Sequence, residues 1–598
     1  MAALLGWVED GVVHQIPSTR SLAPLLLGLS LLGSLSACSG AYGPGQGTHL
    51  ASSGRPAPAP PRPVVRFPTE AELEAIVTRA PAPEVASLTG RPPAVVDSWQ
   101  IEESPAPGDP VYDPEGPIEA LLSRLASGEG IALRRSESLR CTAREMARFR
   151  LANDGPTTSR LARHLLSACG SAAHDVGTFA LTYPARRSDQ AVAQEMASRI
   201  SGDLRRNLSH GSWIGVGFAR SRGTALMVIA FAEPKVAVDP WAGPDGQGRV
   251  RFTGTLRTPG TRISAAITQG PHDAATCTVD SGLTAPAFAL DCPMVAEDAE
   301  ALVEVMLTNS NSLERRVLAS LTVQRDASRA LGFAPTGAAV DDAPVSAARV
   351  LSVVNAQRAA AGLEPLALAA AQSERHQFYA SALFGLSAVD GGDALNDLVL
   401  GLMAGWRVEG APIRDASSVW MHEQRDASLA RVIGGLLETP SGRSALMSPD
   451  ARQLAVGFVE GDAPKHLGVV VTSYEFFEGV DHRAEAAKVL DGLSALRRRR
   501  GLPPVEPLGT LPALTQAATS VAAQGTWPDI ALRTGLDQDS MQMRAALQAS
   551  HIEAVTLDEF PYPVQAVNAA RLNASVVVTH TRAEGAAWGQ YVVFLVMR

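Results

Sequence analysis

The sequence predicts a mixed α/β protein made of three similar units of helices and strands and one all-β domain. The main observation is an internal repeat. Residues 350–366 recur as residues 489–505, and both copies read as an amphipathic helix stopped by glycine and then proline. A second helical run follows each copy, and two apolar strands close each unit, over 453–459 with 467–476 and over 574–581 with 591–597. A fainter copy closes with strands over 213–219 and 225–231.

The all-β domain is predicted between the first two units. There the chain changes to period-two alternation of apolar and polar residues, in short runs separated by turns such as Pro-Gly and Asn-Ser. Short strands of this kind predict an antiparallel sandwich. The expected strands cover 250–256, 262–268, 275–280, 287–292, 301–308 and 316–324.

The order of these segments predicts the domain boundaries. We expect a signal peptide over 1–37, a proline-rich tether over 38–117, unit one over 118–233, the β-domain over 234–326, unit two over 346–480 and unit three over 484–598. Prolines within 57–63 and 81–83 favour extended polyproline II segments in the tether, where residues 70–79 form at most a short helix.

An apolar run at the N-terminus ends in Leu35-Ser36-Ala37-Cys38. Its roughly fourteen apolar positions are too few to cross a bilayer, which takes about twenty, and suit a signal peptide. The ending resembles the lipobox of bacterial lipoproteins, which implies a diacylglyceryl group on Cys38 and cleavage just before it. Ser39 stands where the family's inner-membrane retention signal has aspartate, so the resemblance favours the outer membrane. An uncleaved anchor with a coincidental cysteine is the alternative.

The other four cysteines form two local pairs, Cys141 with Cys169 and Cys277 with Cys292. Disulfides persist in exported proteins, so we expect both pairs to be bridged. Four buried free thiols are the alternative. A zinc site is disfavoured because no two cysteines stand two to four residues apart.

Unit two carries the clearest family resemblance. It opens with Asn355-Ala356-Gln357-Arg358, a Gly-Leu-Glu-Pro-Leu turn follows, and later come Thr-Pro-Ser-Gly-Arg at 439–443 and Gln-Leu-Ala-Val-Gly-Phe at 453–458. In order and spacing these motifs resemble the CAP domains of the SCP/pathogenesis-related superfamily. Unit one echoes them at 214–218. The resemblance implies α-β-α sandwiches with a central cleft, where two histidines and two acidic residues can gather and sometimes bind a divalent metal.

Unit two departs from the family at two of those cleft positions. The histidine of the family's Ser-Pro-Gly-His motif falls on Gly442, and the glutamate of its Gly-Glu-Asn-Ile motif falls on Trp420. Neither residue can ligate a metal or transfer a proton. We therefore expect a degenerate CAP fold with no catalytic residue, no bound metal and no other cofactor.

Other chemical candidates are weak. His422 and Glu423 begin a near match to the zinc-protease HExxH motif, but Asp426 stands in the place of the second histidine. His376 could face the cleft, although a partly exposed helix histidine is the commoner case. The basic run at 497–500 is expected to be a solvated helix end. A net charge of −9 gives no reason to expect nucleic acid.

The sequence thus predicts a membrane-anchored envelope lipoprotein with non-catalytic CAP-like domains, whose partner would be an envelope protein or a lipid. One alternative is a metal-assisted hydrolase of the cell envelope. Its ligands would come from His164, His174 and His210 in unit one or from His551 and His580 in unit three. A lipid-binding carrier is the other alternative.

Overall fold

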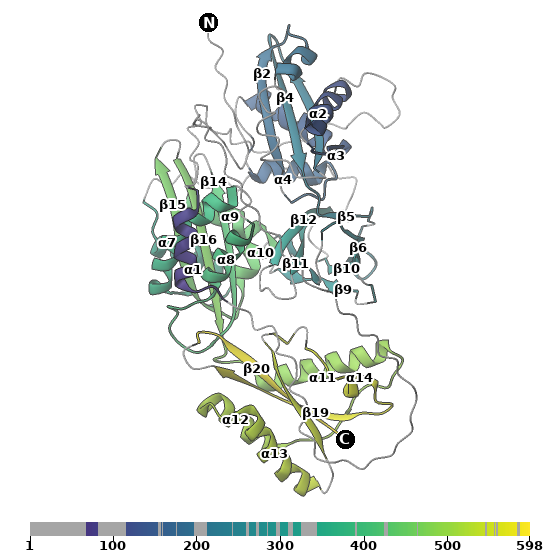
Figure 1. Cartoon of the computed structure of the whole chain (residues 1–598), viewed down its shortest axis with the longest axis vertical. Coiled ribbons are helices and arrows are strands. Elements are labelled where there is room, and N and C mark those ends of the chain that lie inside the picture. The colour runs from purple at the N-terminus through teal and green to yellow at the C-terminus, as the bar shows by residue number, and fades with distance from the viewer. Residues whose placement is uncertain are drawn as a thin grey trace, which may run out of the picture.

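The computed structural model describes residues 67–81, 115–195, 212–324 and 344–598, with short gaps inside these ranges. Cys38 and the expected signal peptide lie outside the described residues. The protein is mixed α/β, and its described strands form five four-stranded sheets. Figure 1 shows unit one at the top, the β-domain and unit two in the middle, and unit three at the bottom. None of the helices in the described residues is long and apolar enough to cross a membrane.

Three of the sheets have the same strand order and the same strand directions. In each, a two-residue strand pairs in parallel with the first strand of a long hairpin, and an antiparallel strand lies on the other side of that hairpin. The strands of unit one, in sheet order, are β1 (Arg134–Arg135), β3 (Trp213–Arg220), β4 (Thr224–Ala232) and β2 (Gly177–Pro184). Those of unit two are β13 (Ala367–Leu368), β15 (Ala451–Asp462), β16 (Lys465–Phe476) and β14 (Ile413–Glu423). Those of unit three are β17 (Glu506–Pro507), β19 (Asn573–Arg582), β20 (Gly589–Met597) and β18 (Gln548–Ala554).

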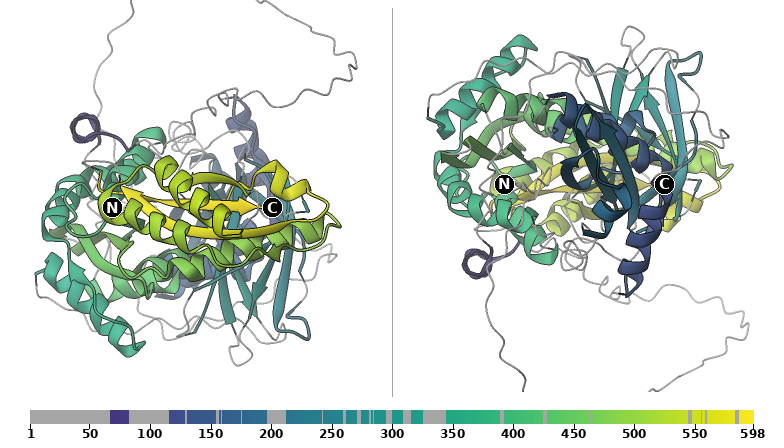
Figure 2. Two further views of the ribbon diagram at one scale, coloured as in Figure 1. Left: turned by 90° about the horizontal axis from the view of Figure 1, so that it is seen from below. Right: turned by 90° about the horizontal axis from the view of Figure 1, so that it is seen from above.

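Helices cover both faces of each of these sheets. In β15, Ala455 belongs to the hydrophobic cluster of one layer of helices, whereas Leu454 and Val456 belong to the cluster of the other. This alternation is expected because successive strand residues point to opposite faces. In unit one, α2 (Gly116–Gly128) covers one face, and α3 (Glu137–Asn153) with α4 (Ser159–Ala168) covers the other. In unit two, one face is covered by α6 (Ala347–Ala360), α9 (Leu429–Glu438) and α10 (Pro440–Met447), and the other by α7 (Ala370–Ala388) and α8 (Gly392–Met403). In unit three, one face is covered by α11 (His482–Arg499) and α14 (Val564–Asn568), and the other by α12 (Pro512–Gln524) and α13 (Pro528–Met543). In Figure 2, the left view shows such helices flanking the yellow strands of unit three.

A buried arginine ties the first helix to its surroundings in units two and three. Arg358 and Arg497 are both 0% exposed. Arg358 Nε donates to the carbonyl of the residue six positions later, Glu364, at 2.8 Å, and Arg497 Nε does the same to Pro503 at 2.9 Å. In each case Nη1 donates to a more distant carbonyl. The expectation of a solvated helix end is therefore wrong for Arg497, because this guanidinium satisfies carbonyls inside the fold.

The β-domain consists of two antiparallel four-stranded sheets with one common hydrophobic cluster. Phe252 and Leu290 enter this cluster from the first sheet, and Ile267 and Val303 from the second. The first sheet consists, in order, of β5 (Val236–Val238), β6 (Arg249–Leu256), β10 (Ala287–Pro293) and β9 (Thr278–Val279). The second consists of β12 (Arg315–Gln324), β11 (Glu300–Thr308), β7 (Arg262–Gln269) and β8 (Ala275–Thr276). One expected strand, 275–280, is divided at Cys277 between the two sheets.

One helix arises within the expected tether. Thr69 and Glu72 form a capping box at the start of α1 (Glu70–Arg79), which fixes where the helix begins. Leu73 and Ile76 of α1 lie in the same hydrophobic cluster as α7 and α8 of unit two. Figures 1 and 2 show this purple helix beside unit two. The sequence allowed a short helix here, but the description of the whole segment as a spacer does not hold for residues 70–79.

Candidate functional site

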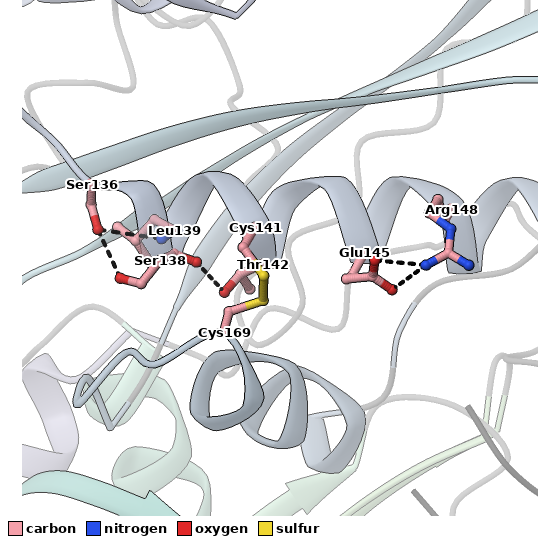
Figure 3. The surroundings of a disulfide bond; sticks show 8 residues. All are labelled: Ser136, Ser138, Leu139, Cys141, Thr142, Glu145, Arg148 and Cys169. Carbon is pink, nitrogen blue, oxygen red and sulfur yellow. Dashed lines mark hydrogen bonds and ion pairs between the residues drawn. A yellow bond between two sulfur atoms is a disulfide. The ribbon is translucent and has the colours of Figure 1, made fainter. Parts of the chain in front are cut away.

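Both expected disulfides are present. Cys141 on α3 is bonded to Cys169, just after α4, across 28 residues, and the two helices are thereby held together (Figure 3). Cys277 is bonded to Cys292 on β10 across 15 residues. Such bonds are typical of extracellular or envelope proteins, where the compartment is oxidising.

Gly442, the position that the sequence motif predicts to match the CAP cleft histidine, lies buried where α10 meets α9. Thr439 caps α10, and its Oγ1 accepts a hydrogen bond from Gly442 N at 3.1 Å. A Cβ atom at Gly442 would overlap the carbonyl oxygen of Leu436 and lie 2.8 Å from Thr439 Oγ1. No side chain therefore fits here, and the position serves contact between two helices.

The start of α10 is also in contact with the β-domain. Ser441 N donates to Oε2 of Glu304 at 2.9 Å, and Glu304 is only 1% exposed. Arg443 Nη1 donates to the carbonyl of Gly270 at 2.7 Å. A buried carboxylate beside the first amides of a helix is electrostatically favourable. Residues 439–443 thus join unit two to the β-domain.

Trp420 does not share a site with Gly442. It lies on β14 and packs in the cluster of α7 and α8, and its Nε1 donates to Oγ of Ser387 on α7 at 3.4 Å. Its neighbours Val419 and Met421 point to the other face, toward α9. The two positions expected to match the CAP cleft therefore lie on opposite faces of the sheet.

His376 is a core histidine. It is 0% exposed, its Nδ1 donates to the carbonyl of Gln372 at 3.0 Å, and its Nε2 is hydrogen-bonded to Oγ1 of Thr472 at 2.7 Å. A Cβ at Gly457 would overlap the backbone of His376, so this glycine allows α7 to lie directly on β15. Burial lowers the pKa of His376 to about 4. The sequence left open whether His376 faces a cleft or is a partly exposed helix residue, and the structure shows neither. Its imidazole is neutral at pH 7.

His422 lies on strand β14, so the near match to HExxH lacks the helix on which that motif depends. Its third member, Asp426, lies outside the described residues. The ring of His422 is 5.6 Å from that of His466 and 5.4 Å from that of Phe384. Burial and, secondarily, the positive charge of His466 lower the pKa of His422 to about 4.

The histidines of units one and three do not gather. His174 Nδ1 is 2.8 Å from Oγ of Ser320 and so links unit one to the β-domain. His551 pairs with Asp529 at 3.2 Å on one side of unit three, and His580 lies elsewhere. His164 lies on α4, whereas His210 is outside the described residues. In the described parts of the chain, no three His, Cys, Asp or Glu side chains are grouped closely enough to hold a metal ion.

A histidine pair that the sequence did not reveal lies where unit two meets unit three. His482 Nε2 and His580 Nδ1 are 3.1 Å apart, and Phe477 stacks on His580 at 4.5 Å. Burial is the main cause, and repulsion from His482 the smaller one, that lowers the pKa of His580 to about 4. Phe477 N donates to the carbonyl of Pro412, so the pair sits beside the chain that links the units. Because the two histidines are 98 residues apart, no local pattern could have indicated their contact.

Comparison with known proteins gives little. No family model and no curated protein matches the chain. A crystal structure of a cysteine-rich secretory protein from Staphylococcus aureus is similar over 40% of this chain and 88% of that one, at 11% identity and a TM-score of 0.16. A likeness of this size carries no argument about fold or function.

Proposed function

We propose that this chain is a lipid-anchored envelope protein whose CAP-like units serve as binding and structural domains rather than as enzymes. The observation that best supports this is the position of Gly442. Where the family places a cleft histidine, this chain has a glycine that no side chain could replace without displacing Leu436. The same motif instead contacts Glu304 of the β-domain.

We further propose that units one, two and three are repeats of one α-β-α domain and that the β-domain is a sandwich between the first two. The common register of the three sheets supports this, since the short parallel strand pairs Arg134 with Trp213, Ala367 with Gln453 and Glu506 with Asn573. The equal spacing of the Arg358 and Arg497 hydrogen bonds supports the closer relation of units two and three.

The β-domain acts in this proposal as a rigid spacer. On one side Ser320 meets His174 of unit one, and Thr322 N donates to Oγ of Ser167 at 2.7 Å. On the other side Glu304 meets unit two. Such contacts on both sides would hold the binding surfaces of the units at fixed distances. An envelope protein or an envelope lipid is the partner we propose for these surfaces.

Replacing Cys38 by alanine tests the anchor. We expect the wild-type protein to begin at a diacylglyceryl cysteine, and Cys38→Ala to keep its leader and carry no lipid, as mass spectrometry of the N-terminal peptide would show. Ser39→Asp is the matched variant, because it keeps the acylated cysteine and should move the protein to the inner membrane fraction. A Cys38→Ala product with unchanged mass and membrane retention would refute the anchor.

Metal analysis tests the absence of catalysis. We expect the purified full chain, dialysed against zinc or calcium, to retain no stoichiometric metal by elemental analysis. His551→Ala with His580→Ala is the informative variant, since these are the ligands that the sequence offers for a hydrolase in unit three. Stoichiometric metal that disappears in this variant would overturn the non-catalytic proposal.

A further inference from the structure

Helix α1 occupies a seat on unit two, between α7 and α8. Leu73 is 0% exposed and Ile76 is 9% exposed, and both contact the hydrophobic cluster of these two helices. The seat is shaped for Leu73, because a Cβ at Gly401 of α8 would overlap the Leu73 methyl groups. The segment of chain that would follow the lipid anchor is therefore fitted to unit two, not to unit one.

Polar and aromatic contacts at the start of the segment extend this fit. Glu70 pairs with Arg375 of α7 at 2.9 Å and with Arg407 at 3.5 Å, and a third of its side chain is exposed. The ring of Phe67 packs against that of Trp588 of unit three, with ring centres 5.3 Å apart and the planes tilted by 32°. Since Trp588 Nε1 donates to the carbonyl of Met403 in unit two at 3.2 Å, residues 67–79 are bound where units two and three meet.

The seat is small and contains a group that opposes docking. A helix of ten residues is too short to be stable alone, so α1 depends on the few side chains that it buries. Tyr379 is 1% exposed in the same cluster, and its hydroxyl has no hydrogen-bond partner in the described structure. A buried hydroxyl without a partner is unfavourable. The charges of Glu70 and Glu74 on α1 act on Tyr379, so this phenol lies near the helix.

We propose that α1 is a releasable strap, which holds the anchor-proximal chain against unit two and lets the body move away from the membrane when it leaves its seat. The change in reach rests on the proposed lipid anchor at Cys38. From Cys38 to Thr69 there are 31 residues, which span at most about 110 Å. With α1 released, the next helix in the described part of the chain is α2, 78 residues from Cys38, and the limit becomes about 270 Å.

Hydrogen exchange measured by mass spectrometry on the full chain tests the release. We expect the amides of α1 to be protected, but to exchange at least tenfold faster than those of β15 and β16. Gly401→Ala should abolish the protection of α1, because the new methyl group fills the place of Leu73. Tyr379→Phe should slow the exchange of α1, because it removes the unpartnered hydroxyl.

Two further variants make this test specific. Adding Leu73→Ala to Gly401→Ala returns room to the seat and should restore part of the protection, which a general loss of folding could not do. Ala75→Gly weakens the helix at an exposed position and shows how much of the effect comes from helix propensity alone. The strap is overturned if α1 exchanges no faster than β15 and β16 in the wild type, or if Gly401→Ala changes nothing.

Neutron reflectometry of the lipidated protein on a supported bilayer tests the reach. The protein layer should lie further from the bilayer in Gly401→Ala than in the wild type. Failure of both proteins to bind the bilayer would overturn the anchor, and with it the change in reach, but would leave the exchange result standing. Binding with an unchanged layer position would overturn the strap alone.

Discussion

Two residues that the sequence motifs mark as candidates for a functional site are instead part of the packing between helices and strands. Gly442 is needed so that α10 can touch α9, and His376 fills the contact between α7 and β15. The sequence identified both positions but not their surroundings. Which face of β14 a residue occupies depends on the strand's register, and so the separation of Trp420 from Gly442 could not be read from a motif alignment.

The buried imidazole of His376 makes acid destabilising. Its pKa is about 4 in the folded chain, against about 6.5 when unfolded, so the unfolded state binds more protons between these values. Stability is therefore complete above pH 6.5 and falls as the pH drops toward 4, by roughly 3 kcal/mol for this residue. His376→Gln should lose this part of the dependence in urea unfolding at pH 7 and pH 5. His551→Gln, at a partly exposed position, is the control, and an equal pH dependence in wild type and His376→Gln would contradict the assignment.

At the level of elements, two short helices make the contacts that hold separate parts of the chain together. Helix α10 has eight residues, and Glu304 and Gly270 of the β-domain bind its first turn. Helix α1 has ten residues and attaches the N-terminal chain to unit two. Long amphipathic helices and apolar hairpins could be predicted from their periodicity. These docking contacts could not, because Glu304 and Ser441 are 137 residues apart and Glu70 and Arg375 are 305 apart.

The contact of Glu304 with α10 should couple the unfolding of unit two to that of the β-domain. Glu304→Gln removes the negative charge at the helix N-terminus while keeping the shape of the side chain, and should weaken the contact by about 1.5 to 3 kcal/mol. Scanning calorimetry should then resolve two transitions where the wild type has fewer. Asp239→Asn, an exposed carboxylate of the same domain, should leave the profile unchanged. A Glu304→Gln profile equal to the wild type would show that the contact does not couple the domains.

For the whole molecule, the three units expected from the sequence each contain a sheet of the same strand order. The offset between residues 350–366 and 489–505 is kept in the hydrogen bonds of Arg358 and Arg497, so local pattern and packing agree there. The sequence predicted most strands of the β-domain, although it missed β5 and joined β8 and β9 into one strand. It also predicted both cysteine pairs, since each disulfide closes a short stretch of chain. What joins the units, including the contact of His482 with His580, arises only when the finished domains meet.

Both disulfides lie in the first half of the chain, and only that half needs an oxidant to form its cross-links. Every cysteine lies at or before residue 292, so residues 293–598 contain none. Unit one and the β-domain each gain stability from a cross-link, on the order of 3 kcal/mol for a loop of fifteen residues. Units two and three can reach their folded state without any thiol chemistry. The first half of the chain therefore needs an oxidising environment to form its cross-links, and residues 293–598 do not.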